Sequence, residues 1–263
     1  MARTVNEIRE RIEQQFPPSY AMSWDNPGLL VGSGSREVTK VVLALDATDE
    51  VIDEAIRAGA ELILTHHPMI FKSVAKVNDE SAVGRRILKL VRHDISYYAM
   101  HTNFDIAPGG MAKLVAERMG VRVLRPMEVT GQAEEAPIGI GFVGLLSEGP
   151  LRAETLARRI KERFSIPSVV YYDGGREIQK VAVCPGSGRG LYGLAREAGA
   201  DAYITGDMGH HDGIDAVEDG VTLIDAGHFG LEHIYVEAMH GFLKRKFPEL
   251  IVLENLTDLR KTV

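Results

Sequence analysis

The sequence predicts an α/β fold with two α/β domains, each built on a mostly parallel or mixed sheet. Short apolar runs alternate with helical patterns along most of the 263 residues. That length corresponds to one large domain or two small ones. Polar motifs follow several of the apolar runs, at the strand ends where parallel sheets bind ligands.

The first half of the chain has the pattern of a β-α-β-α-β run. Thr4 and Glu7 form a capping-box pattern at the start of a first helix, and Thr48 is the expected N-cap of a second. The apolar spacing within Ser81–His93 predicts a third. Because such runs favour parallel pairing, we expect a parallel sheet from the strands Val41–Leu45, Leu62–Leu64 and Ile95–Met100.

A change of composition at Gln132–Pro137 predicts a domain boundary. We expect residues 1–130 plus 229–263 to form the first domain and residues 131–228 the second. Helices are expected over Arg152–Phe164, up to about Ala198, through Asp215, and in one long final helix from His228. The expected strands are Ile138–Leu146, Ser168–Tyr172, Val181–Cys184, Ala202–Thr205, Val221–Asp225 and Ile251–Leu253.

Charge and composition exclude several classes of protein. The net charge of −7, from 30 basic and 37 acidic residues, makes nucleic-acid binding an unfavourable interpretation. The single cysteine, Cys184, allows no internal disulfide and is expected to be inert packing. No apolar stretch is long enough to span a bilayer, and the N-terminus carries charge from its third residue. We therefore expect a cytoplasmic protein with no membrane partner.

Four polar motifs follow predicted strands. Because the carboxyl ends of parallel strands meet at one edge of a sheet, these motifs are expected to collect at one site. Two lie in the first half of the chain and two in the second: Thr65–Pro68, His101–Asp105, Thr205–Asp207 and Gly227–Glu232.

These motifs contain the residue types of a metal site. His228 and Glu232 are four apart at the head of a helix, so both side chains share one face. The adjacent His66 and His67 can splay at a strand end, and Asp105 adds a carboxylate. Three imidazoles and two carboxylates suit zinc, iron, manganese or cobalt, and exceed what one catalytic zinc takes. We therefore predict two divalent metal ions per chain.

Two further motifs allow more than one interpretation. In the Gly-rich stretch Pro185–Gly190, the backbone of Gly186 and Gly188 and the side chain of Arg189 can bind a phosphate group, or the stretch is a tight structural turn. Trp24, the only tryptophan, can stack on a base or fill a gap.

The motifs together resemble the GTP cyclohydrolase I type 2 family, also called the Nif-three-like family. This resemblance implies two α/β domains, a dinuclear metal site in the cleft between them, and a ring-shaped homohexamer. It also implies that this chain is the short form, without the inserted domain of some relatives. The matching stretches are SWDNPGLLVG (Ser23–Gly32), LTHHPMIF (Leu64–Phe71), HTNFD (His101–Asp105), GADAYITGD (Gly199–Asp207) and LIDAGHFGLE (Leu223–Glu232).

The resemblance also implies a role for each site residue. Its metal ligands fall on His66, His67, Asp105, His228 and Glu232. Glu232 would bridge both ions, with His67 and Asp105 on one ion and His66 and His228 on the other. The pattern places His101 beside the site, holding a ligand or a water, and His211 near its rim.

Three functions follow as hypotheses. The first is hydrolytic opening of GTP at C8 of the guanine ring, giving formate and dihydroneopterin triphosphate, with His101 or His211 moving protons. Gly186, Gly188 and Arg189 would then hold phosphates. The second is a phosphoesterase or another nucleotide hydrolase that uses the same ions. The third is a metal-binding or scaffold protein without turnover, although nitrogen and oxygen ligands favour a water-accessible site over a closed structural one.

Overall fold

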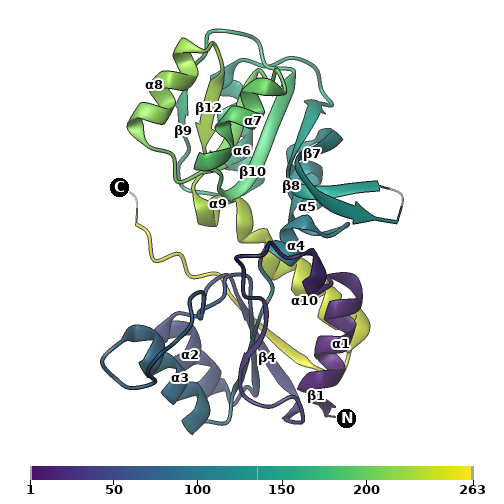
Figure 1. Ribbon diagram of the computed structural model, residues 1–263, viewed down its shortest axis with the longest axis vertical. Helices are drawn as coiled ribbons and strands as arrows, with labels where there is room; N and C mark the ends of the chain where they lie inside the picture. The colour runs from purple at the N-terminus through teal and green to yellow at the C-terminus, as the bar shows by residue number, and fades with distance from the viewer. Residues whose placement is uncertain (1, 135, 262–263) are drawn as a thin grey trace. The chain divides into compact units, whose positions relative to one another are not determined.

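The computed structural model describes residues 2–134 and 136–261, and the chain divides into two compact units. Unit 1 consists of Met1–Phe104 with Tyr235–Thr257. Unit 2 consists of Asp105–Ile234 with Asp258–Val263. In Figure 1, unit 1 contains the purple and blue segments and unit 2 the teal and green ones.

Unit 1 is built on a five-stranded mixed sheet in the order β13-β4-β5-β6-β2. The first four strands are parallel, and β2 is antiparallel to β6. Helices α2 and α3 lie on one side of the sheet and α1 and α10 on the other (Figure 1). The strands are β2 (Gly28–Val31), β4 (Lys40–Ala44), β5 (Leu62–Thr65), β6 (Ser96–Ala99) and β13 (Ile251–Asn255), beside a small ladder of β1 (Arg3–Thr4) and β3 (Glu37–Val38).

The helices of unit 1 begin where the sequence provides caps. The Thr4 hydroxyl accepts from the Glu7 amide, and the Glu7 carboxylate accepts from the Thr4 amide, which confirms the predicted capping box. Thr48 caps the next helix, which ends at Gly59 in the left-handed conformation. The bounds are α1 (Val5–Gln15), η1 (Pro18–Tyr20), α2 (Asp49–Ala58), α3 (Ala82–Arg92), α4 (Thr102–Ile106) and α10 (Ile234–Lys246).

Unit 2 contains a six-stranded mixed sheet in the order β7-β8-β10-β11-β12-β9. Its central strands β10, β11 and β12 are parallel, and the outer pairs are antiparallel. The strands are β7 (Val121–Ala133), β8 (Ala136–Leu146), β9 (Val170–Tyr172), β10 (Lys180–Ser187), β11 (Ala202–Gly206) and β12 (Thr222–Asp225). The helices are α5 (Met111–Met119), α6 (Ala153–Arg163), η2 (Arg189–Leu191), α7 (Tyr192–Glu197), α8 (His210–Glu218) and α9 (His228–Glu232).

Three sequence expectations differ from this structure. The boundary expected after residue 130 lies inside β7. Gln132 and Ala133 of β7 pair with Pro137 and Ala136 of β8, so a boundary there would cut a hydrogen-bonded ladder. The single final helix expected from His228 is two helices, α9 and α10. The segment Gly28–Val31, which is not among the strands expected from the sequence, forms strand β2.

The two units share one local hydrogen-bond pattern. The segments Ala58–Thr65 (AGAELILT) and Ala198–Thr205 (AGADAYIT) each lead from a helix end into a strand. Lys40 and Lys180 each begin the preceding strand and donate Nζ to the carbonyl of the alanine that starts the segment. The acidic residue of each segment accepts the amide of the same lysine, at 2.9 and 2.7 Å. The repeat gives both sheets the same geometry at the start of these strands, and the polar motifs follow at the opposite, carboxyl ends.

Candidate functional site

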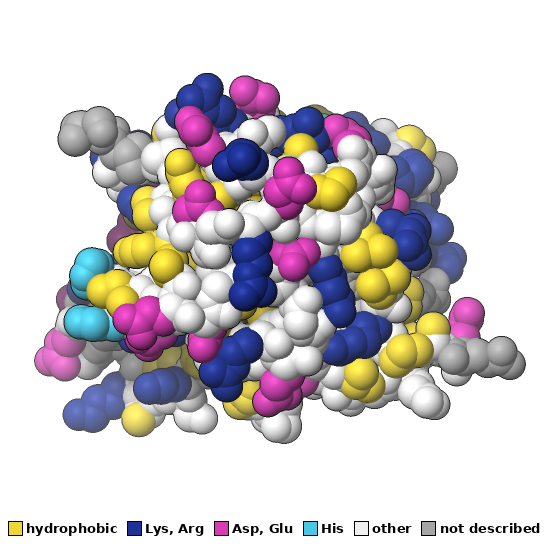
Figure 2. Space-filling model, turned by 90° about the horizontal axis from the view of Figure 1, so that it is seen from above, with side chains coloured by type: hydrophobic (Ala, Val, Ile, Leu, Met, Phe, Trp, Pro, Cys, Tyr) yellow, Lys and Arg dark blue, Asp and Glu magenta, His cyan; other side chains and the backbone are white. Residues whose placement is uncertain are grey.

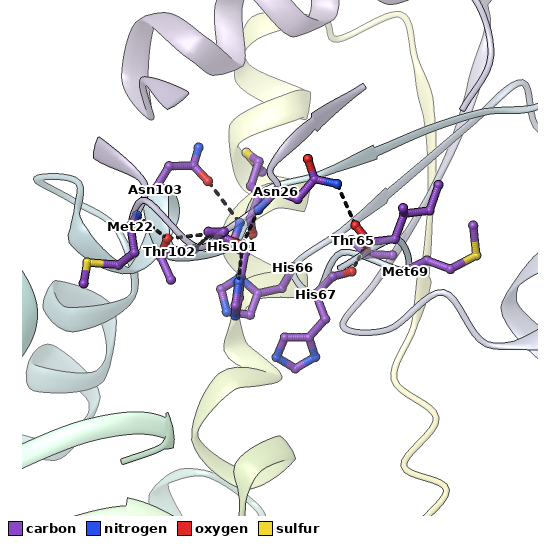
Figure 3. A network of polar contacts seen from close by, with 12 residues as sticks. Met22, Asn26, Thr65, His66, His67, Met69, His101, Thr102 and Asn103 are labelled. Atoms are coloured by element: carbon purple, nitrogen blue, oxygen red, sulfur yellow. Dashed lines mark hydrogen bonds and ion pairs between the residues drawn. The ribbon is translucent and has the colours of Figure 1, made fainter. Parts of the chain in front are cut away.

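Two histidines follow strand β5 in unit 1. His66 is fully buried, and its Nδ1 lies 2.8 Å from the carbonyl oxygen of Met100. Its ring lies beside those of His67 and His101 (Figure 3). The neighbouring His67 has its Nδ1 2.8 Å from Oδ1 of Asp46. Both rings are therefore oriented through Nδ1, which leaves Nε2 as the nitrogen that a metal ion would bind.

His101 comes from the end of the next strand, directly before α4. Its Nδ1 lies 2.8 Å from Oδ1 of Asp25, whose Oδ2 accepts from the Thr102 amide at 2.9 Å. Burial alone would raise the pKa of Asp25, but the hydrogen bonds from His101 and Thr102 outweigh it and lower that pKa to about 2. Asp25 is therefore a carboxylate at neutral pH and fixes the His101 ring.

The three histidines of unit 1 form one group. One ring nitrogen from each of His66, His67 and His101 lies within 4.8 Å of the other two. Three imidazole nitrogens at this spacing can hold a first-row divalent ion. The structure thus brings His101 close enough to the two predicted ligands to act as a ligand itself, as well as to hold a proton or a water.

Unit 2 contributes a histidine and two carboxylates. Nδ1 of His228 lies 2.7 Å from Oδ2 of Asp207, and its Nε2 lies 3.1 Å from Oε2 of Glu232. The four-residue spacing therefore places both side chains on one face of α9, as the sequence predicts. An oxygen of Asp105 lies within 4.8 Å of a Glu232 oxygen, and Glu232 is buried. Two carboxylates in such proximity, one of them buried, repel one another unless a cation or a proton lies with them.

Four imidazoles share one kind of hydrogen-bond contact, three in unit 1 and one in unit 2. His66, His67, His101 and His228 each have Nδ1 against a backbone carbonyl or a carboxylate. Histidines that bind metals are generally held in this way, because the outer hydrogen bond fixes the tautomer and the ring orientation. The sequence analysis missed the three carboxylates involved, although two lie within motifs and the third lies just beyond β4: Asp25, Asp207 and Asp46.

Gly186 makes room for Glu232. It lies in β10 with φ +74°, so the stretch predicted as a Gly-rich turn is in part a strand. A Cβ at this position would come 2.3 Å from Oε1 of Glu232 and 3.4 Å from Nε2 of His228. Only glycine therefore leaves the Glu232 carboxylate where it lies.

The other two residues expected to bind phosphate have protein partners. The Gly188 amide donates to Oγ1 of Thr205 at 2.9 Å. The Arg189 guanidinium lies 2.8 Å from Oδ2 of Asp212. A phosphate group bound here would have to compete with both contacts.

Two other residues considered in the sequence analysis are members of none of these groups among the described residues. His211 is exposed at the start of α8, with its ring 5.4 Å from that of His210, and belongs to none of the potential ligand groups among the described residues. Cys184 is buried, and burial, followed by the charges of Asp105 and Glu232, raises the pKa of its thiol well above the usual range. A protonated, buried thiol fits the predicted packing role.

The surface carries charges of both signs. On the face seen in Figure 2, basic side chains lie among acidic ones. Among the described residues, no helix is both long and apolar enough to cross a membrane.

Fold and site together define an α/β protein of two mixed sheets with a candidate metal site of histidines and carboxylates. Residues 3–258 match the family model described as Duf34/NIF3 (NGG1p interacting factor 3). The chain belongs to this family, in agreement with the resemblance that its motifs predict.

Several relatives carry the name GTP cyclohydrolase 1 type 2 homolog. The one from Clostridium perfringens is 38% identical over 229 residues, covering 87% of this chain and 86% of that protein. The one from Staphylococcus aureus strain N315 is 28% identical over an alignment of 344 residues that covers 92% of this chain. Because 344 exceeds the 263 residues of this chain, that relative has residues with no counterpart here.

Solved structures share the fold over the whole chain. The Staphylococcus aureus hypothetical protein SA1388 has a TM-score of 0.88 and 31% identity, covering 99% of each chain. Reduced HcgD from Methanocaldococcus jannaschii has a TM-score of 0.84 and 27% identity, covering 97% of this chain and 98% of its own.

Proposed function

We propose that this protein is a dinuclear metal-dependent hydrolase that opens the guanine ring of GTP. One observation carries the proposal: in unit 1, one ring nitrogen from each of His66, His67 and His101 lies within 4.8 Å of the other two. Histidines that only fill a core need not bring their ring nitrogens together, whereas the ligands of a metal ion do. The name GTP cyclohydrolase 1 type 2 homolog, carried by relatives up to 38% identical, supports GTP as substrate.

The proposed ligands are His66, His67, Asp105, His228 and Glu232. Nitrogen and carboxylate donors suit zinc, manganese, iron or cobalt. The burial of His66 and Glu232 shields these donors from competing water. Two such ions, when bound, would lower the pKa of a water toward neutrality and so supply the nucleophile for attack at C8 of guanine.

His101 is proposed to move the proton. The Asp25 carboxylate holds its Nδ1, so a proton is accepted or delivered at Nε2. The same carboxylate offsets the positive charge that the ring acquires, and the hydrogen bonds from Thr102 keep Asp25 in place. His211 is the alternative donor in the sequence-based proposal, but its contacts place it in no ligand group.

The test is GTP turnover by protein loaded separately with zinc, manganese or iron, with metal content measured in each sample. The readouts are formate, pterin fluorescence after oxidation, and inorganic phosphate. His66→Ala removes a proposed ligand, and His93→Ala, at an exposed position, is the matched control. We expect formate from the unmodified protein and from His93→Ala, and none from His66→Ala.

Other outcomes identify the alternatives. Phosphate release without formate would replace the cyclohydrolase by a phosphoesterase. Bound metal without any turnover would leave a metal-binding or scaffold role. Equal formate release from His66→Ala would remove the metal-dependent mechanism at these residues.

A further inference from the structure

Two aromatic side chains of unit 1 are exposed. Trp24 is 54% exposed and Phe71 is 45% exposed. Among the described phenylalanine, tyrosine and tryptophan residues, only Tyr171 joins them in the exposed class. Exposing large rings to water is unfavourable, and Trp24 clearly does not fill a gap in the core.

These rings lie together beside the histidine group. The Trp24 and Phe71 ring centroids are 5.8 Å apart with the planes tilted by 50°. The His101 ring is 6.0 Å from Trp24 and 6.3 Å from Phe71. Two of the three exposed aromatic side chains among the described residues therefore meet beside the group of His66, His67 and His101.

The chain holds both rings in position. Asn26 Nδ2 donates to the Ile70 carbonyl at 2.6 Å, which connects the loop of Trp24 to the loop of Phe71. Asp25, next to Trp24, is held by His101 and Thr102. Rings fixed in this way lose little conformational entropy when a ligand binds.

We propose that Trp24 and Phe71 bind the planar heteroaromatic ring of a nucleotide next to His101. The choice of a nucleotide rests on the proposed function, and the exposed rings and their anchoring are independent of it. Aromatic side chains stack on any base, because every base offers a π face. A nucleotide base bound here would have its edge next to His101, which is proposed to move the proton.

The surroundings favour a small anionic ligand over a protein surface. The loop that follows Phe71 also exposes Val74 and Val77, but the lysines at positions 72 and 76 interrupt this apolar surface. Lysine is depleted in the buried core of protein interfaces, whereas it suits the phosphates of a nucleotide.

Trp24 is the only tryptophan, so its fluorescence reports on this position alone. The experiment titrates the full chain with GTP, guanosine and tripolyphosphate, in chelator and with added manganese, using free tryptophan to correct for absorbance. Phe71→Leu keeps the reporter, and Tyr171→Leu, at the other exposed aromatic position, is the matched control. For Trp24→Leu, equilibrium dialysis of GTP replaces fluorescence, and thermal melting checks that each variant folds.

We expect GTP and guanosine to quench Trp24 and tripolyphosphate not to. Phe71→Leu and Trp24→Leu should each raise the Kd for GTP about tenfold, and Tyr171→Leu should not. Quenching without formate release would retain this inference and remove the cyclohydrolase. GTP turnover with an unchanged KM in Phe71→Leu and Trp24→Leu would retain the cyclohydrolase and remove this inference. An absence of quenching, or a Trp24 already shielded from acrylamide by a second copy of the chain, would overturn the inference.

Discussion

His101 and His228 occupy equivalent positions in the two units. Each follows a central strand of its sheet, β6 or β12, and each has a carboxylate four residues later in the chain. Their Nδ1 atoms lie 2.8 and 2.7 Å from carboxylates, those of Asp25 and Asp207. The candidate ligands therefore occur where a strand leads into a helix in each unit, and these junctions are far apart in the sequence.

The carboxylates that orient the histidines should matter for metal affinity. Asp46→Asn and Asp207→Asn keep the size of the side chain but remove its charge, so each imidazole loses its fixed tautomer. We expect each change to weaken zinc or manganese binding about 10–100-fold. Competition with a chelating dye measures this, and Asp79→Asn, at an exposed position, is the control. Unchanged metal affinity in both variants would show that Asp46 and Asp207 do not support metal binding.

Gly186→Ala should damage the site through Glu232. The added Cβ would lie 2.3 Å from Oε1 of Glu232, and the backbone has φ +74°. We expect a loss of about 1–2 kcal/mol of stability from the backbone conformation and a lower metal content. Gly190→Ala is the matched control, because a Cβ there meets no atom within 4 Å. Thermal melting and elemental analysis measure the two effects. Full metal content in Gly186→Ala would contradict the proposed role of Glu232.

His101→Gln should separate proton transfer from metal binding. We expect formate release to fall about 10²–10⁴-fold while the metal content stays at the level of the unmodified protein. His93→Gln, at an exposed position, should change neither quantity. A loss of metal in His101→Gln would instead make His101 a ligand, as its distance to His66 and His67 also allows.

Glu61 should make stability depend on pH. Burial raises the pKa of Glu61, but the amides of Thr39 and Lys40 donate to its carboxylate and lower that pKa overall. A folded pKa below the unfolded value of 4.5 contributes stability above that value, which is lost as pH falls through the folded pKa. After allowance for solvent screening, the contribution is about 1 kcal/mol.

Glu61→Gln tests this contribution directly. We expect its Tm to lie about 2–4 °C below that of the unmodified protein at pH 7 and the difference to shrink below pH 4. Thermal melting at a series of pH values measures the difference. A Tm difference that stays constant down to acid pH would assign the effect to packing.

The sequence by itself determined the order and type of most elements. Periodicity and caps predict the buried strand β5 and helix α2, because burial of one face and the hydrogen bonds of Thr48 are local properties. The i, i+4 pair His228 and Glu232 was predictable for the same reason. The sequence did not predict strand β7. The long hairpin of β7 with β8 has exposed and Gly-containing stretches that interrupt the apolar pattern.

Only the tertiary structure decided which residues support the site. Asp25 reaches His101 across 76 positions of sequence, and no local pattern specifies such a contact. The role of Gly186 likewise depends on the distance of Glu232 from the β10 backbone. Side-chain chemistry and short-range spacing can be read directly from the sequence. Contacts between distant residues form only when the strands of a sheet are assembled side by side.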